Sequence, residues 1–330
     1  MARYPQIEEL LGRAQSAMGS REYSRRTRSA YTAWLKQFLL FHKCPHPSTL
    51  DQRHAEQFLE YLEAKRNLAA KTRNQAASAI AFLYREILGS DAMAQVARPR
   101  NRRGVPVVLS RQEVSRVLSE LRGKYWLIAA LLYGTGMRLN ECLSLRVKDV
   151  DFDLAQIAVR DGKGGSHRFV PLPEQLRDPL SRQVTTVRQI TSADQRRGQG
   201  WAPLPGALHR KDPKAGYALA WQYLFPASRV RRDKTTRQAG RPHLHPTAVQ
   251  KQMKQAVLAA GLLKPATCHS LRHSFATQML RDGCDIRSLQ KLMGHSDVRT
   301  TMIYLHATDQ IGIGLRTPID RLIDQSGQPG

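Results

Sequence analysis

Apolar residues recur at helical spacing along the first ninety residues of the chain. Positions i, i+3 and i+4 share one face of an α-helix. Residues 1–95 are therefore predicted to form an all-helical unit, because each stripe can bury one face of a helix in a common core. The three clearest stripes are Tyr31, Trp34, Leu35, Phe38 and Leu39; Phe58, Leu59 and Leu62; and Ala77, Ile80, Leu83 and Ile87.

A second pattern begins after residue 106. Ser110 and Glu113 match a capping box at the start of a helix through Leu121. The apolar run YWLIAALLY predicts another helix, and from residue 155 to 172 apolar and polar residues alternate around DGKGGSH, which predicts a β-hairpin. Helical spacing returns at Pro246. The fold class is therefore mainly α with a small antiparallel β-sheet (α+β), with a second domain at 107–330.

Two segments break these patterns. The stretch ARPRNRRGVP, which includes Arg102 and Arg103, combines proline, glycine and four arginines. It predicts an extended basic linker at 96–106. Residues from about 190 to 245 interleave basic residues with aromatic ones, among them Trp201 and Trp221. Some of these rings must be core, but aromatic faces beside cations also suit unstacked bases.

Charge narrows the class of partner. Lys and Arg number 52 against 27 Asp and Glu, which gives a net charge of +25. Because the basic residues are spread along the chain, DNA is favoured over an acidic membrane surface. Arg25, Arg26 and Lys71 lie beside the apolar stripes of the helical unit and are candidates for contact with phosphates.

Composition also limits the compartment and the cofactors. The four cysteines are scattered, without a CxxC pair, which favours a reducing cytoplasm over a disulfide frame or a zinc site. His243 and His245 lack an acidic or thiol partner nearby in sequence, so no metal is predicted. The longest apolar run is too short to cross a bilayer, and no signal segment or membrane span is expected.

The stretch from Thr267 to His306 holds the densest set of chemical groups. Its spacing predicts two or three short helices, the first capped by Ser270. His269 and Arg272 are three residues apart and share a helix face, and His295 and Tyr304 follow. Two imidazoles, a guanidinium and a phenol supply proton transfer, anion binding and a nucleophile.

Two upstream groups fit the same chemistry. Arg138 follows a glycine turn at the start of a helix, and Glu141, three residues on, is placed to orient its guanidinium. Lys163 lies in the Gly-rich tip of the predicted hairpin, where most lysines are merely solvated. A tip of this kind can also carry an ammonium into a phosphate site and donate a proton there.

In this order the groups resemble the tyrosine recombinase family, which breaks and rejoins DNA. The matching stretches are GTGMRLNE, GKGGSHRFVPL, HSLRHSFAT and LMGHSDVRTTMIYLH. The resemblance implies an N-terminal SAM-like core-binding domain and a C-terminal catalytic domain, a 3′-phosphotyrosyl intermediate made by Tyr304, no cofactor, and four protomers on two paired sites. It implies that Arg138 and Arg272 grip the phosphate, Lys163 protonates the leaving oxygen, His269 takes the phenol proton and His295 bonds the phosphate, with Glu141 supporting them.

The segment at about 190–245 is similar to the extra segment of integron integrases within that family. These enzymes recombine gene cassettes at folded single-stranded hairpins and at a double-stranded attachment site. The similarity implies that Trp201, Trp221 and His243 contact extrahelical bases. The alternative is a phage-type or chromosomal recombinase that acts only on duplex sites.

Two further rivals and a terminal segment complete the expectations. A regulator that kept the fold without cleaving would lack one of the six groups, and type IB topoisomerases place their Lys and His differently. The segment TPIDRLI, residues 317–323, is short and amphipathic. We expect it to dock on a neighbouring protomer or to pack on its own domain.

Overall fold

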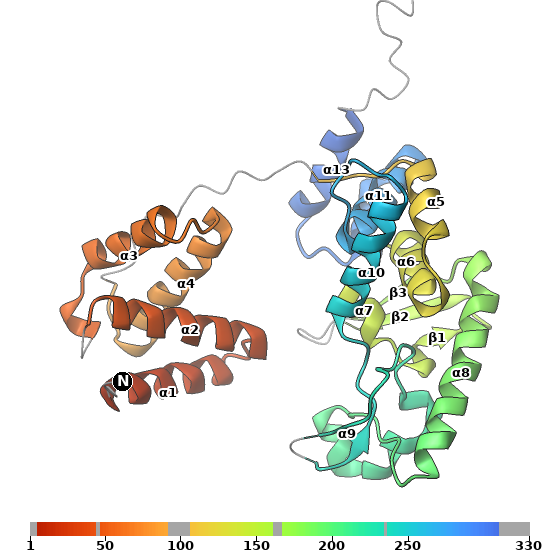
Figure 1. The fold of residues 1–330 in the computed structure, drawn as a ribbon, viewed down its shortest axis with the longest axis horizontal. Coiled ribbons are helices and arrows are strands. Elements are labelled where there is room, and N and C mark those ends of the chain that lie inside the picture. The colour runs from red at the N-terminus through yellow and green to blue at the C-terminus, as the bar shows by residue number, and fades with distance from the viewer. Residues whose placement is uncertain (1–4, 44–46, 92–105, 161–166, 234–235, 310–330) are drawn as a thin grey trace, which may run out of the picture. The chain divides into compact units, whose positions relative to one another are not determined.

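The structure is a computed structural model that describes residues 5–43, 47–91, 106–160, 167–233 and 236–309. It divides into two compact units, Met1–Gly104 and Val105–Gly330 (Figure 1). Most of the expected linker, with Arg102 and Arg103, lies outside the described residues. So do the hairpin tip with Lys163 and the segment 317–323.

In its described residues, the first unit is a bundle of four α-helices. Its core contains Phe38, Phe58 and Ile80, one from each predicted stripe, so those three helices are confirmed. Ser24 and Asp51 cap two of the helices by accepting backbone N–H groups with their side-chain oxygens. The helices are α1 (Pro5–Ser20), α2 (Arg25–Phe41), α3 (Gln52–Ala64) and α4 (Ala70–Ile87).

The second unit is built around one apolar helix. Helix α6 is apolar all round and buried along most of its length, as expected for a helix inside a core. It packs against α5, α8, α10 and α11. The capping box of Ser110 and Glu113 is confirmed at the start of α5. The helices are α5 (Arg111–Ser119), α6 (Gly123–Thr135), α7 (Leu139–Ser144), α8 (Arg177–Gln195), α9 (Gly206–Lys211), α10 (Pro246–Ala259), α11 (Cys268–Arg281), α12 (Ile286–Met293) and α13 (Arg299–Asp309).

A small antiparallel sheet covers one side of this core. The predicted hairpin is present as β2 (Gln156–Arg160) and β3 (His167–Pro171), with Ile157 opposite Val170. The strand β1 (Val150–Asp151) extends it to the order β1-β2-β3, and β4 (Arg231–Arg232) pairs with β5 (Ala239–Gly240). The predicted α+β class is confirmed.

The inserted segment folds around an indole. Helix α8 continues to Gln195, past the expected start of the segment at about 190. Short turns follow, and Figure 1 shows α9 at the end of the second unit away from α13. Trp201 is only 3% exposed. A Cβ added to Gly240 would lie 1.6 Å from the Trp201 carbonyl oxygen, so the β5 backbone must approach this residue as glycine. Trp201 is therefore part of the core of the insertion.

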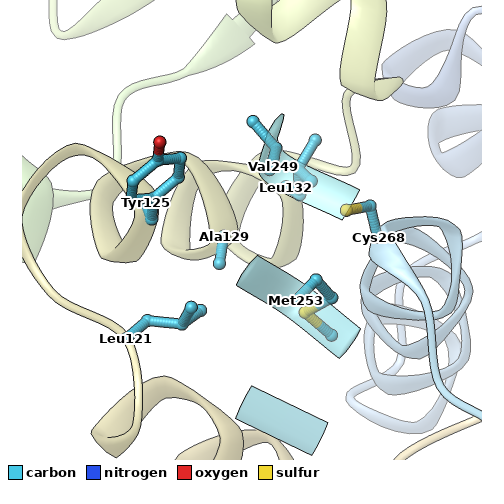
Figure 2. Close-up of a pocket in the computed structure, with 7 residues that line it drawn as sticks. All are labelled: Leu121, Tyr125, Ala129, Leu132, Val249, Met253 and Cys268. Atoms are coloured by element: carbon cyan, nitrogen blue, oxygen red, sulfur yellow. The ribbon is translucent and has the colours of Figure 1, made fainter. Parts of the chain in front are cut away.

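An apolar pocket lies between α6, α10 and the start of α11. Figure 2 shows its lining, with the Tyr125 hydroxyl turned away from the other side chains. Since its lining carries no charge, this pocket is part of the packing of the core. Its residues are Leu121, Tyr125, Ala129, Leu132, Val249, Met253 and Cys268. No helix in the described part of the chain has the length and apolarity needed to span a membrane.

Candidate active site

Helix α11 begins earlier than the sequence suggested. The prediction that Ser270 caps it is wrong, because Thr267 is the N-cap and its Oγ1 accepts the His269 backbone N–H at 3.2 Å. Ser270 closes the reciprocal capping box by accepting the Thr267 backbone N–H at 3.0 Å. The first turn is thereby fixed by two side chains, and Arg272 projects from the buried side of a rigid helix.

Arg272 is the largest side chain that is fully buried among the described residues, with 1% exposure. Its Nη1 donates to the Gly136 carbonyl, and its Nη2 donates to the Met293 carbonyl at 2.7 Å and to His295 Nε2 at 2.9 Å. Within the described part of the chain these contacts use three of the five guanidinium N–H groups, so two remain for an anion. Burial and the nearby Arg138 lower the pKa of Arg272 to about 10, which leaves it charged at neutral pH.

Two further guanidiniums, those of Arg138 and Arg168, lie near Arg272 and are joined by one carboxylate. Glu141 is 9% exposed and accepts Arg138 Nη1 at 2.7 Å and the Arg138 backbone N–H at 2.8 Å. It also accepts Arg168 from β3 in a bidentate pair at 3.2 and 2.6 Å. Burial alone would raise the pKa of Glu141, but the hydrogen bonds from Arg168 and Arg138 outweigh burial and lower it. Glu141 is therefore an anion that fixes both arginines.

Arg168 was not among the predicted residues, although it lies in the stretch GKGGSHRFVPL. Its Nε donates to the Leu292 carbonyl at 2.8 Å, which joins β3 to α12. Gly294 has φ +62°, and an added Cβ there would meet Arg168 Nη1 at 2.7 Å. The glycine before His295 therefore allows the helix to end in the left-handed conformation and leaves room for the guanidinium.

His295 is held in one tautomer. Its Nε2 faces an Arg272 N–H and must accept, so its Nδ1 carries the proton and donates to Thr301 Oγ1 at 2.8 Å. Burial, followed by the charges of Arg272 and Arg138, lowers the pKa of His295 to about 4. The ring is therefore neutral and lies parallel to the Tyr304 ring, with 6.3 Å between centroids and 13° between planes.

Tyr304 lies on α13 and is 2% exposed. It packs in a small cluster with Phe275, Leu289 and Met293. Burial raises the pKa of its phenol, while the charges of Arg272 and Arg138 act in the opposite direction. Its hydroxyl lies 2.9 Å from Nδ1 of His273, a residue that sequence reasoning did not select. The adjacent "RH" in HSLRHSFAT was its signal.

The structure thus gathers Arg138, Glu141, Arg272, His295 and Tyr304 in one place. His269 is exposed at the start of α11, and its ring contacts His273 edge to face at 4.4 Å between centroids. Arg25 and Arg26 on α2 and Lys71 on α4 are exposed side chains of the first unit. Three guanidiniums against one carboxylate leave the second-unit cluster with two net positive charges (three minus one). Such a cluster suits a phosphate group beside a tyrosine hydroxyl.

The predicted base-contacting residues do not share one environment. The prediction that Trp201 contacts an extrahelical base is wrong for this structure, because its ring is buried and its Nε1 donates to the Pro213 carbonyl at 3.3 Å. Trp221 and His243 are half-buried. Over the Trp221 ring lie the Arg146 guanidinium, at 5.1 Å from the centroid, and the Lys148 ammonium, at 3.1 Å. Only Trp221 and His243 of the three keep ring surface for a ligand.

Each of the two units matches a known protein family model. The family model described as "Phage integrase family" matches residues 108–310. The model "Phage integrase, N-terminal SAM-like domain" matches residues 10–93. Among solved structures, that of XerH site-specific recombinase bound to a palindromic difH substrate has a TM-score of 0.62 at 19% identity and covers 99% of this chain and 84% of its own. A lambda integrase dimer bound to a core site also has a TM-score of 0.62, at 15% identity over 89% of this chain and 96% of its own. At these identities the structures show the fold alone.

Sequence relatives carry the assignment further. An "Integrase/recombinase" of Escherichia coli is 45% identical over 91% of this chain and 90% of its own length. The tyrosine recombinase XerA of Thermococcus kodakarensis is 31% identical over 84% of this chain and 83% of its own. Both family models cover the units that carry the helical bundle and the arginine cluster. The chain therefore belongs to the phage integrase family, and it is a tyrosine recombinase, an enzyme of site-specific DNA recombination.

Proposed function

We propose that Tyr304 is the nucleophile of this recombinase and that Arg138 and Arg272 hold the scissile phosphate. The observation that carries this proposal is the stacking of the buried Tyr304 ring on His295, whose Nε2 accepts a hydrogen bond from Arg272. Tyr304 Oη forms a bond to phosphorus, the bond from phosphorus to the 5′-oxygen breaks, and a 3′-phosphotyrosyl link remains. The free donors of Arg272 and the exposed edge of Arg138 stabilise the negative charge that builds up on the non-bridging oxygens.

The other predicted residues have supporting roles in this proposal. Glu141 positions Arg138 through the hydrogen bonds described above. His295 bonds the same phosphate once its Nε2, which accepts from Arg272 in the free protein, leaves that contact and takes a proton. Lys163, in the tip between β2 and β3, protonates the leaving 5′-oxygen. Energy of the broken linkage is kept in the phosphotyrosine, so the reverse attack by a 5′-hydroxyl rejoins the strand without a cofactor.

For the substrate, we propose the integron integrase specificity: capture and excision of gene cassettes at folded single-stranded hairpins, and at a duplex attachment site. The support is the inserted segment between α8 and α10, where Arg146 and Lys148 lie over the ring of the half-buried Trp221. An aromatic face next to cations stacks an unpaired base and binds its phosphate. His243 lies beside Tyr223 on the same segment, with ring centroids 5.4 Å apart.

DNA contact by the first unit and assembly on DNA belong to the same proposal. Arg25, Arg26 and Lys71 are exposed and bind phosphates of the duplex arms, together with Arg102 and Arg103 of the linker. Four protomers act on two paired sites, and residues 317–323 of one protomer dock on the next. Four coupled subunits allow strands to be exchanged two at a time.

The test offers two labelled substrates, a folded single-stranded cassette hairpin and a duplex attachment site, to the wild-type chain and to Tyr304→Phe. We expect a covalent complex, seen in a denaturing gel, with the wild type on both substrates. Tyr304→Phe should bind both DNAs and form no covalent complex, because only the attacking oxygen is missing. A covalent complex with Tyr304→Phe would refute the nucleophile.

The same two substrates distinguish an integron integrase from a recombinase that acts only on duplex sites. If the wild type formed a covalent complex on the duplex and none on the hairpin, a phage-type or chromosomal recombinase would be favoured. Relaxation of a supercoiled plasmid that lacks any attachment site would favour a topoisomerase activity, which needs no paired sites. Hairpin binding without a covalent complex would refute the proposed chemistry at that substrate.

A further inference from the structure

The partner of the Tyr304 hydroxyl is a histidine one residue after the buried arginine. Tyr304 Oη lies 2.9 Å from His273 Nδ1, and the two ring centroids are 5.5 Å apart. The residues come from different helices, α11 and α13, which pack along each other. Since Tyr304 is 2% exposed, its hydroxyl has little access to solvent, and within the described residues its hydrogen bond is to this side chain.

The protonation states follow from the surroundings. Burial raises the pKa of the Tyr304 phenol, so in the free protein the oxygen carries its proton. Burial, followed by the neighbouring His269 and Arg272, lowers the pKa of His273 to about 4, so its ring is neutral. The phenol therefore donates and Nδ1 accepts, which places the remaining ring proton on Nε2. The groups that act on this imidazole are His269 and Arg272 from α11 and Tyr304 from α13.

The neighbouring groups are less suited to take the phenol proton. Arg138 and Arg272 are donors without an accepting lone pair. His295 lies flat beside the Tyr304 ring, and its two nitrogens already face Arg272 and Thr301. His269 is exposed at the helix start and meets the edge of His273, one ring away from the phenol.

We propose that His273 is the general base of strand cleavage, which takes the phenolic proton on Nδ1 as Tyr304 Oη bonds to phosphorus. This inference rests on the proposed nucleophile. The proton moves from Oη to Nδ1, the electron pair of the O–H bond forms the new O–P bond, and the bond to the 5′-oxygen breaks. That oxygen takes a separate proton from Lys163 or water. In the rejoining step Nδ1 returns its proton to the departing phenolate.

The same geometry predicts that the phenol keeps its proton in the free protein. A neutral imidazole beside Arg272 resists protonation, and a buried phenol resists ionisation, so the free protein keeps a neutral hydrogen bond. A bound phosphate brings a negative charge next to Arg272 and offsets the field that opposes an imidazolium. A bound phosphate therefore favours transfer of the proton to His273.

The test compares His273→Asn with the matched variant His269→Asn one turn earlier on the same helix. An asparagine keeps a hydrogen-bond acceptor for the phenol and cannot take a proton at neutral pH. Single-turnover formation of the covalent complex is measured on a nicked duplex site that the wild-type chain cleaves, between pH 6 and pH 9. Each rate is divided by the wild-type rate at the same pH, so that titration of other groups cancels.

For His273→Asn we expect a loss of about 10²- to 10⁴-fold at pH 7, the range for a general base. Solvent must then form the phenolate, so the loss should shrink by about tenfold per pH unit, because the phenolate fraction rises tenfold per unit below the phenol pKa. His269→Asn should show no such slope. A slope in His269→Asn alone, or a wild-type rate in His273→Asn, would overturn the inference.

A second substrate shows whether His273 acts as the base for the phenol or as the acid for the leaving oxygen. When sulfur replaces the bridging 5′-oxygen, the leaving thiolate needs no proton, so a variant that lacks the acid regains its rate. We expect His273→Asn to stay slow on this substrate, and a return to the wild-type rate would overturn the inference. Thermal unfolding and binding to the uncleaved duplex check that each variant is folded. If the wild type itself formed no covalent complex, the proposed nucleophile would fail, which is a different outcome from each of these.

Discussion

The arginine cluster and the inserted segment are organised by different forces. The cluster links α7, β3, α11 and α12 through charged hydrogen bonds to one carboxylate and to carbonyls at helix ends. The inserted segment has short turns and two-residue strands, packed around the ring of Trp201. The charged hydrogen bonds of the cluster set the positions of individual donor and acceptor atoms. In the inserted segment, apolar packing around one ring holds the surrounding turns together. The two regions should therefore respond differently to substitution and to pH.

The largest effect on stability is expected at Trp201. Trp201→Ala removes a buried indole and should destabilise the inserted segment by about 3–5 kcal/mol. Because no charge is removed, the loss should be the same at pH 7 and pH 4. Hydrogen exchange of residues 196–233 and 236–245 measures it directly. Exchange as slow as in the wild type would mean that the ring does not support the segment.

A smaller and pH-dependent effect is expected at Glu141. The Glu141 pKa lies below its usual value of 4.5, since hydrogen bonds from Arg168 and Arg138 outweigh burial. A lowered pKa means that this carboxylate stabilises the fold above about pH 4.5, and that the stabilisation is lost as pH falls below it. Glu141→Gln should cost about 2–3 kcal/mol at pH 7, where it leaves Arg168 and the partly exposed Arg138 without their anion.

Urea unfolding of Glu141→Gln and of the wild type at pH 7 and pH 4 provides the measurement. The difference between the two proteins should be largest at pH 7 and should narrow at pH 4. Glu120→Gln, at the exposed end of α5, is a matched control that should change little at either pH. An equal cost of Glu141→Gln at both pH values would contradict the assignment of Glu141 as an anion.

The sequence predicted the cluster better than the insertion for a physical reason. Arg138, Glu141, Arg272, His295 and Tyr304 are polar groups in apolar surroundings, and few other roles suit them there. Arg168 was missed because an arginine on a strand is usually solvated, and its bond to Glu141 joins residues 27 positions apart. His273 was missed because its neighbour His269 occupies the position that the resemblance identifies.

The insertion could not be read in this way. A tryptophan that packs in a core and a tryptophan that stacks on a base can have the same neighbouring residues in the sequence. Local composition therefore does not distinguish the two roles. Trp201 and Trp221 are twenty residues apart, and the sequence treats them alike. The close approach of Gly216 to the Trp201 indole separates them, because a Cβ added at Gly216 would lie 2.3 Å from Trp201 Nε1. The four helices of the first unit and the hairpin are local patterns, so most of them were predictable.

The smallest effect on stability, and the sharpest on specificity, is expected at Trp221. Its half-buried ring carries Arg146 and Lys148 on its surface, so Trp221→Ala should cost about 1–2 kcal/mol, the sum of two partly exposed cation–π contacts. If the ring also stacks on a base, hairpin binding should weaken by about 1–3 kcal/mol while duplex binding is kept.

Trp221→Phe retains an aromatic face and should recover most hairpin affinity, which a general folding defect would not allow. Binding of both variants to the labelled hairpin and duplex, measured at one salt concentration, decides the matter. If Trp221→Ala weakened binding to the hairpin and to the duplex equally, Trp221 would have a packing role like that of Trp201. The structural support for hairpin recognition would then be lost.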